Sequence, residues 1–410
     1  MRRTEGLLAS VILALALAAE AAEPVLPDVA ATPAERTFIE RHWRGSIPPQ
    51  GAPPARFSPI ERSLQPEACG ACHPVQLGDW QTSLHARSMG PGVMGQLVEM
   101  RRREPATARS CARCHAPVAE QRPELLEANR VVTNPDFDVT LESRGIICAS
   151  CHLRGREHFG PPRRDGSTDS RVSRERLPHG GVTRTGAFLR AEFCASCHQF
   201  GSEGLAFNGK PLENTFSEWR RSPAARRGWQ CQHCHMPDRR HLWRGIHDPE
   251  MVRGGLDIVL RAGRERYRAG EAARATLVIT TPRVGHAFPT YVTPQVRVKA
   301  ELRDAAGQVV AGSVEERVIG RQVPLDLSRE IADTRIPPGG RFTLAYSRRV
   351  DGPGWRLYVT ITVLPDEFYT RFFEVLLTSV AGAGEADIRR ALEATRRSPY
   401  TLYEKELPLS

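Results

Sequence analysis

The sequence predicts two structural classes in one chain: a region of short helices and loops, followed by a small antiparallel β-sandwich and a C-terminal helix. Three observations support this prediction. Five C-x-x-C-H pentapeptides lie within residues 67–252, hydrophobic residues alternate with polar ones from about residue 256, and the last stretch has a period of 3.6. We therefore expect a proline-rich N-terminal segment at 22–66, a motif-bearing domain at 67–252, a β-sandwich domain at 253–368 and a helical segment at 369–410.

All ten cysteines belong to the five pentapeptides. This signature attaches a c-type haem, because the two thiols add to the porphyrin vinyl groups and the adjacent histidine binds the iron. Zinc ribbons and disulfides are the alternatives, but a histidine follows all five pairs although only 13 of 410 residues are histidine. We predict five c-type haems on Cys69, Cys72, Cys111, Cys114, Cys148, Cys151, Cys194, Cys197, Cys231 and Cys234, with the proximal iron ligands His73, His115, His152, His198 and His235.

The motif-bearing domain has too few residues per pentapeptide to build a separate hydrophobic core around each haem. We expect the haems to pack near one another and to form the core themselves. Proline, glycine and arginine are frequent between the motifs, so the helices should be short. The fold should then depend on the cofactor, and the domain should be unfolded without haem.

The N-terminus has the features of a secretory signal peptide. Met1-Arg2-Arg3 precedes an apolar run over residues 7–19, and Ala19-Glu20-Ala21 is a small-x-small cleavage site. We predict that residues 1–21 are removed and that the mature protein lies in the periplasm or outside the cell, where haem attachment also takes place. A helix should follow, since Thr32-Pro33-Ala34-Glu35 has the pattern of a capping box with proline at the first helical position.

The formal net charge of +10 is compatible with the predicted cofactors. Five haems carry ten propionate groups, so part of the excess positive charge serves to compensate them. A basic chain can also indicate nucleic-acid binding, but this compensation and the predicted secretion argue against it. We predict no nucleic-acid partner.

The strand pattern of the second region is clearest at residues 296–303 and 357–363. Further candidates are residues 275–281, 308–311 and 342–346, and turn residues separate them. Several short strands at this spacing indicate an antiparallel β-sandwich. In the last stretch Ile388, Ala391, Leu392 and Thr395 share one face of the predicted helix, with arginines in its final turn.

The second axial ligand decides whether each haem iron is closed to small molecules. Eight histidines lie outside the proximal positions, and five would close every iron. Methionine could serve instead, but the surplus of histidines favours bis-histidine haems of low potential. We predict distal ligands at His85, His179, His241, His247 and His286.

The remaining histidines suit this role less well. His42 has the position of a packed aromatic neighbour in the N-terminal helix, and His233 lies inside the fifth pentapeptide. His286 is unusual because its loop, Gly285-His286-Ala-Phe-Pro289-Thr290, belongs to the β region. We expect this loop to cross the domain boundary and so to fix the orientation of the two domains.

The sequence resembles multihaem c-type cytochromes related to the tetrahaem cytochrome c of ammonia oxidisers, hydroxylamine oxidoreductase and pentahaem nitrite reductase. The resemblance is carried by the first motif with Asp79-Trp80-Gln-Thr-Ser83-Leu-His85, by the third and fifth motifs and by residues 285–290. It implies stacked and perpendicular haem pairs, distal histidines near His85, His247 and His286, and periplasmic electron transfer. The C-x-x-C-Lys motif common in pentahaem nitrite reductase does not occur in this sequence.

The sequence thus predicts a secreted pentahaem cytochrome that passes electrons between redox partner proteins, with donor, acceptor and direction undetermined. One alternative is an oxidoreductase in which a single open haem acts on a small nitrogen or sulfur compound or on peroxide. Another is a haem subunit of a larger electron-transfer assembly. Peripheral association with a membrane complex and formation of an oligomer also stay open.

Overall fold

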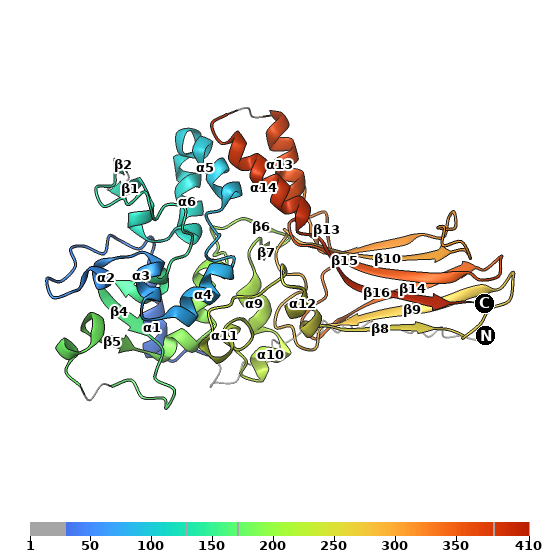
Figure 1. The fold of residues 1–410 in the computed structure, drawn as a ribbon, viewed down its shortest axis with the longest axis horizontal. Helices are drawn as coiled ribbons and strands as arrows, with labels where there is room; N and C mark the ends of the chain where they lie inside the picture. Colours follow the sequence, from blue (N-terminus) through green and yellow to red (C-terminus); the bar gives the residue numbers. More distant parts are fainter. Residues whose placement is uncertain (1–29, 128–129, 170–171, 380–381, 410) are drawn as a thin grey trace, which may run out of the picture.

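The computed structural model describes residues 30–127, 130–169, 172–379 and 382–409. The predicted signal peptide, residues 1–21, lies outside these residues. Figure 1 shows a body of short helices and loops from which long strands project to one side, with two C-terminal helices packed on the body. The region of residues 67–252 forms most of this body, and the alternating region forms the projecting strands.

The helices of the body are short, and many begin with proline in the first turn. Proline is tolerated there because N–H groups of the first turn make no hydrogen bond within the helix. They are α1 (Pro33–His42), α2 (Pro59–Arg62), α3 (Pro66–Gly70), α4 (Pro74–Thr82), α5 (Pro91–Arg103), α6 (Pro105–His115), α7 (Cys148–His152), α8 (Glu192–His198), α9 (Thr215–Arg220), α10 (Pro223–Arg226), α11 (Cys231–His235) and α12 (Pro249–Gly255). Short 3-10 turns are η1 (Ala119–Gln121), η2 (Arg174–Arg176), η3 (Pro178–Gly180), η4 (Gly186–Leu189) and η5 (Pro237–Arg239).

The predicted N-terminal helix is confirmed as α1. The Thr32 hydroxyl accepts a hydrogen bond from the Glu35 backbone N–H at 3.3 Å, and the Glu35 carboxylate accepts one from the Thr32 N–H at 2.7 Å. These two bonds satisfy backbone donors that the first helical turn leaves unpaired.

Among the described residues, the strands of the body form two pairs, β1-β2 and β6-β7, and one three-stranded sheet, β3-β4-β5, and longer strands form two antiparallel sheets beyond it. Strands of the body are β1 (Glu124–Glu127), β2 (Arg130–Thr133), β3 (Leu153–Arg154), β4 (Glu157–Gly160), β5 (Val182–Arg184), β6 (Ala206–Phe207) and β7 (Lys210–Pro211). The projecting strands are β8 (Asp257–Ala262), β9 (Ala272–Thr280), β10 (Gln295–Arg303), β11 (Glu315–Ile319), β14 (Arg341–Arg349), β15 (Arg356–Leu364) and β16 (Tyr400–Pro408), with the short β12 (Arg321–Gln322) and β13 (Ala332–Asp333) near their base.

One sheet has the strand order β11-β10-β15-β16 and the other β14-β9-β8. Alternate residues of both sheets contribute to one hydrophobic cluster, in which Val298 and Ile361 are fully buried. The alternation of hydrophobic and polar residues therefore arises from β-strands with one buried face, as predicted, because successive side chains of a strand point to opposite faces. In the body, by contrast, the buried hydrophobic residues form several separate small clusters.

The second region differs from the sequence prediction in three places. Residues 308–311 form no strand beyond one isolated bridge, Arg303 to Val309, because the chain has just reversed at residues 304–307, a turn that Asp304 caps. Strands β8 and β11 were not predicted. The segment predicted to be helical contains α13 (Glu367–Ser379) and α14 (Glu385–Arg397), but then ends in strand β16, which pairs with β15.

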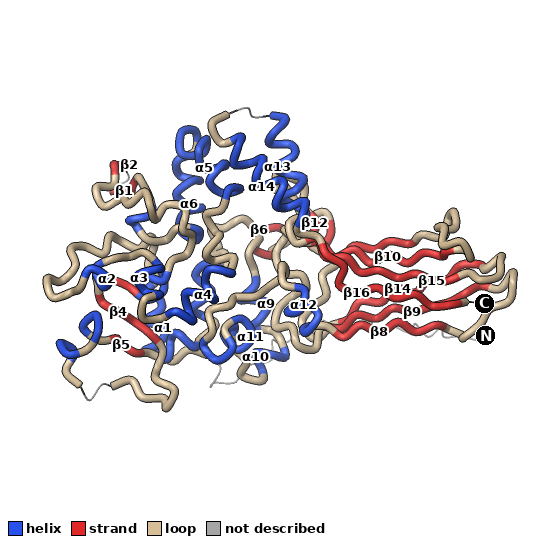
Figure 2. The backbone as a smooth tube through the Cα atoms, viewed as in Figure 1, coloured by secondary structure: helices blue, strands red, loops and turns tan. Residues whose placement is uncertain are grey.

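The two C-terminal helices pack on the body through α14 and α5 (Figure 2). Ile388, Ala391, Leu392 and Thr395 of α14 are buried. Gly95 of α5 allows the close approach, because a Cβ atom at this position would lie 2.8 Å from the Ile388 side chain. Among the described residues, none of the helices combines the length and the apolar character that a membrane span needs.

We expect Gly95→Val to lower the free energy of unfolding by about 1–3 kcal/mol, because the added methyl groups overfill the contact between α5 and α14. Chemical denaturation measures this change. The matched control is Gly78→Ala in α4, where a Cβ atom would meet no atom within 4 Å. It should stabilise the protein by about 0.5–1 kcal/mol, and equal effects of the two substitutions would contradict the role given to Gly95.

Candidate haem sites

A single cavity of about 2650 Å³ runs through the body and reaches the base of the sheets. All ten cysteines and eleven of the thirteen histidines line it. Ordinary ligand pockets hold about 300–1,000 Å³, so this cavity has space for several large ligands. The two histidines outside its wall are His42 and His233.

Short helices present the pentapeptides to the cavity. The second motif ends α6, the third forms α7, the fourth ends α8 and the fifth forms α11, while the first joins α3 to α4. In a helix, residues at i, i+3 and i+4 share one face. The spacing C-x-x-C-H therefore directs both thiols and the imidazole to the same side, which explains why every motif faces the common space.

Contacts between thiols show which motifs are neighbours. The two thiols shift each other's pKa in three pairs, Cys69 with Cys148, Cys114 with Cys197 and Cys194 with Cys231. The first motif thus adjoins the third, and the fourth adjoins both the second and the fifth. Cys151 of the third motif also lies within electrostatic range of Cys194 and Cys197. The fourth motif is therefore the centre of the arrangement.

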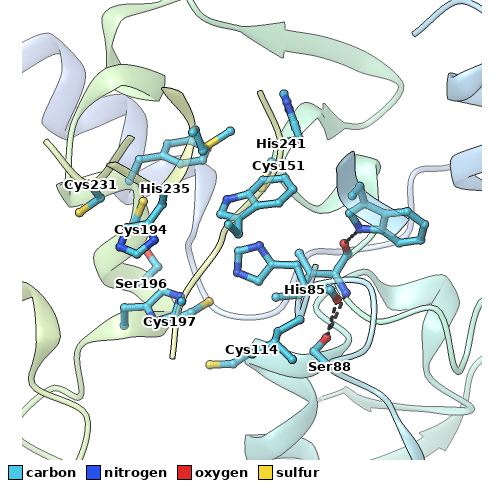
Figure 3. Close-up of a pocket in the computed structure, with 18 of the residues that line it drawn as sticks. His85, Ser88, Cys114, Cys151, Cys194, Ser196, Cys197, Cys231, His235 and His241 are labelled. Carbon is cyan, nitrogen blue, oxygen red and sulfur yellow. Dashed lines mark hydrogen bonds between the residues drawn. The ribbon is translucent and has the colours of Figure 1, made fainter. Parts of the chain in front are cut away.

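Three proximal histidines each face one predicted distal histidine. The ring centroids lie 6.2 Å apart for His198 and His85, 6.2 Å for His152 and His241, and 6.3 Å for His235 and His286. Figure 3 shows the His85 ring directed toward the labelled cysteines of the fourth motif, with His235 and His241 among the residues that line the same pocket.

These separations fit one metal ion between each pair of rings. Zinc–imidazole bonds, taken as a guide for other transition metals, are about 2.0–2.1 Å long, so two rings on opposite sides of one ion have centroids about 6 Å apart. The rings of His235 and His286 are also nearly parallel, at 14°. The side chains present thus fit haem iron with two axial histidines at three of the five motifs.

The other ring nitrogen of several of these histidines is held by a backbone carbonyl. The Nδ1–H group of His115 donates to Ser88 O at 2.6 Å. That of His152 donates to Phe159 O at 2.8 Å, and that of His235 donates to Arg244 O at 2.7 Å. Among the distal candidates, His241 donates to Arg239 O at 3.1 Å and His286 to Ala287 O at 2.9 Å. Such bonds fix the tautomer and leave Nε2 for the metal.

Burial favours the neutral form, which is the form that binds metals, in four histidines of the cavity, namely His85, His152, His235 and His241. It lowers the pKa of His85 to about 3, with a further contribution from His198 and His235. Burial also lowers the pKa of His152 and of His235 to about 4, and it lowers the pKa of His241. Burial raises the pKa of the Cys151 thiol to about 11.

His179 and His158 form a stacked pair with ring centroids 4.3 Å apart, and both line the cavity. Nδ1 of each ring is buried without a hydrogen-bond partner. His73 is among the groups that lower the pKa of His179, after burial. The pair therefore lies in the neighbourhood of the first motif, and the role of His179 as a distal ligand stays a prediction.

His247, also predicted as a distal ligand, is placed differently. It lines the cavity, but its Nε2–H donates to the Asp366 carboxylate at 2.9 and 3.0 Å. This hydrogen bond occupies the nitrogen that His241 and His286 keep for the metal. His42 is a packed core histidine, as expected: its Nε2–H donates to Cys151 O and its ring stacks on Phe38.

The second motif has different surroundings, which the sequence did not predict. Among the described residues, no histidine ring faces His115 at the separation seen in the three pairs. Tyr291 and Tyr369 lie near Cys111 in the cavity wall, and Asp366 with its partner His247 lies beside Tyr369. Burial raises the pKa of both tyrosines. These residues are far from the motif in sequence, so no local pattern indicates them.

All ten cysteines are free thiols. Within the described part of the chain, no group of three or more His, Cys, Asp or Glu side chains is arranged to hold a metal ion, as a zinc ribbon would require.

Comparison with known proteins also supports c-type haem binding. Residues 68–153, which contain the first three motifs, match the family model for cytochrome c554 and c-prime. A search of curated proteins finds no match. Among solved structures, the chain is similar to a penta-heme cytochrome c552 from Thermochromatium tepidum, with 17% identity and a TM-score of 0.60 over 86% of this chain and 100% of that chain.

Other similarities cover smaller parts of the chain. The putative ApaA protein from Bordetella pertussis has 11% identity and a TM-score of 0.17 over 38% of this chain and 91% of that chain. The alkylpurine DNA glycosylase AlkC from Pseudomonas fluorescens has 11% identity and a TM-score of 0.18 over 41% and 36%.

The family match and the penta-heme neighbour support a multihaem c-type cytochrome that binds c-type haem. Such a protein suggests electron transfer. The neighbour also suggests the count of five. The three groups of relatives named from the sequence stay predictions.

Proposed function

We propose that this protein is a secreted pentahaem c-type cytochrome that carries electrons between redox partners, mainly through bis-histidine haems. The observation that supports this proposal most strongly is that all ten motif cysteines and three pairs of facing histidines line one cavity. Bound haem supplies reversible one-electron iron chemistry. The chain attaches the groups, closes their axial positions and brings the motifs into contact, while the sheets form a β-sandwich module beside them.

The thiol contacts suggest the route. The first motif adjoins the third, and the third adjoins the fourth. The fourth motif in turn adjoins both the second and the fifth. Cys72 of the first motif and Cys234 of the fifth are the exposed cysteines. We place the exchange of electrons with partner proteins at these two ends, and the signal peptide supports a periplasmic or extracellular location.

Electron paramagnetic resonance of the ferric protein tests the ligation. We expect at least three low-spin bis-histidine haems, and His241→Ala should convert one of them to a high-spin haem, because it removes the ring opposite His152. An unchanged spectrum in this variant would remove the evidence for bis-histidine ligation at the third motif. His233→Ala, at a histidine outside the cavity wall, is the control and should leave the spectrum unchanged.

A second candidate function is catalysis at the second motif. It is favoured by one observation: Tyr291 and Tyr369 line the cavity near Cys111 of this motif. Among the described residues His115, like His73, faces no second histidine at the separation of the three pairs. An iron that is open on one face can bind a small molecule, and the two tyrosines could donate hydrogen bonds to it.

Ligand addition separates the two functions. If the second motif is open, the ferric protein should show one high-spin signal that changes on adding nitrite or cyanide, and Tyr369→Phe should alter that change. A protein with only low-spin signals, unaffected by either ligand, would be a carrier.

A further inference from the structure

Two loops that carry distal histidines are held by buried carboxylates. The Asp79 carboxylate of α4 accepts a hydrogen bond from the His241 backbone N–H at 2.8 Å. The Glu218 carboxylate of α9 accepts one from the Ala287 N–H at 3.1 Å, directly after His286, and one from the Thr290 hydroxyl at 3.4 Å. In both cases the acceptor comes from a distant part of the sequence.

Each carboxylate is also paired with an arginine. Arg240 donates two hydrogen bonds to Asp79, at 2.6 and 2.7 Å, and Arg335 donates one to Glu218 at 2.8 Å. The side chains of Asp79 and Glu218 are only 5% and 8% exposed. A buried carboxylate without a cation is costly, so the paired arginine favours the position of each carboxylate beneath its loop.

The contact at Glu218 crosses from the haem-binding body to the sheet region. The loop at 285–290 is fixed on its other side by Phe288, which exchanges two backbone hydrogen bonds with Ile336. Arg335, the partner of Glu218, also pairs with Asp333. The loop is thus clamped between the two regions, with His286 directed at His235.

We propose that Asp79 and Glu218 are positioning residues that hold His241 and His286 against the irons of the third and fifth motifs. The inference rests on the proposed function, because it takes these histidines as distal ligands. Anchoring the backbone N–H limits the movement of the loop, and the imidazole therefore stays opposite its proximal partner. Partners of metal ligands of this kind typically change metal affinity about 10–100-fold when they are removed.

The experiment uses the full haem-loaded protein with Glu218→Gln and Asp79→Asn, which keep side-chain size but remove the charge. Carbon monoxide binds ferrous haem only after the distal histidine leaves, so its binding rate reports how well the histidine is held. We expect the rate at one haem to rise at least about 10-fold in each variant. The fraction of high-spin ferric haem should rise as well, and added imidazole should reverse it.

Glu330→Gln is the matched control. Glu330 is 7% exposed and pairs with Arg321 and Lys210 in the same region, but it makes no hydrogen bond to the 285–290 loop. It should destabilise folding without changing carbon monoxide binding. Equal binding rates in Glu218→Gln, Glu330→Gln and the unsubstituted protein would overturn the positioning role.

His286→Ala distinguishes failure of this inference from failure of the proposed ligation. If His286→Ala creates a high-spin haem while Glu218→Gln has no effect, His286 is a ligand and only the positioning role is wrong. If His286→Ala leaves the spectrum unchanged, the ligation itself fails and the inference at Glu218 fails with it. The same comparison holds for His241→Ala and Asp79→Asn.

Discussion

Without haem, the body of this protein should lose its fold while the two sheets keep theirs. The body surrounds a cavity of about 2650 Å³ with several small hydrophobic clusters, so the protein contacts that remain there cannot compensate the entropy of ordering the chain. The sheets have one continuous core of their own, with Val298 and Ile361 fully buried.

Hydrogen exchange measured by mass spectrometry on protein made without haem attachment tests this expectation. Amides in α6, α8 and α11 should exchange as in an unfolded chain, and those in β10 and β15 should stay protected. Protection of the body helices in haem-free protein would contradict the view that the cofactors form its core. The haem-loaded protein is the reference for both regions.

His85→Ala should have the largest effect of a single substitution on electron transfer. His85 faces His198 of the fourth motif, which contacts the second and fifth motifs through its cysteines. Loss of this ligand should make one haem high-spin and raise its reduction potential, because an imidazole that stabilises the ferric form is removed. Potentiometric titration and resonance spectra measure both changes.

The control for this substitution is His42→Ala. His42 is also a buried histidine, but it hydrogen-bonds to Cys151 O and stacks on Phe38 outside the cavity wall. The His42→Ala substitution should lower the free energy of unfolding, but it should not convert any low-spin haem to a high-spin one. If both variants gave the same spectral change, the effect of His85→Ala would be one of packing and not of ligation.

Much of the site could be predicted because the chemistry is local. The five pentapeptides place two thiols and an imidazole on one helical face, whatever the rest of the chain does. The capping box at Thr32 and the alternation in β10 and β15 are local as well. Strand β16 was missed because the residues that precede it are helical and its pairing partner, β15, lies far back in the sequence.

The distal positions were harder to predict, since a histidine in a loop becomes a ligand only if the fold brings it opposite a motif. His247 resembles His241 in sequence context, yet Asp366, 119 residues later, accepts its Nε2–H. Tyr291 and Tyr369 near the second motif carry no local signal for the same reason.

The sequence by itself predicted five haem attachment motifs and an alternating β region after them, because thioether attachment and strand periodicity depend on residues a few positions apart. Only the tertiary structure decided which motifs adjoin one another, which histidines form pairs and which residues surround the second motif. Those properties depend on contacts between distant segments, such as Glu218 with Ala287 and His198 with His85, which local spacing does not encode.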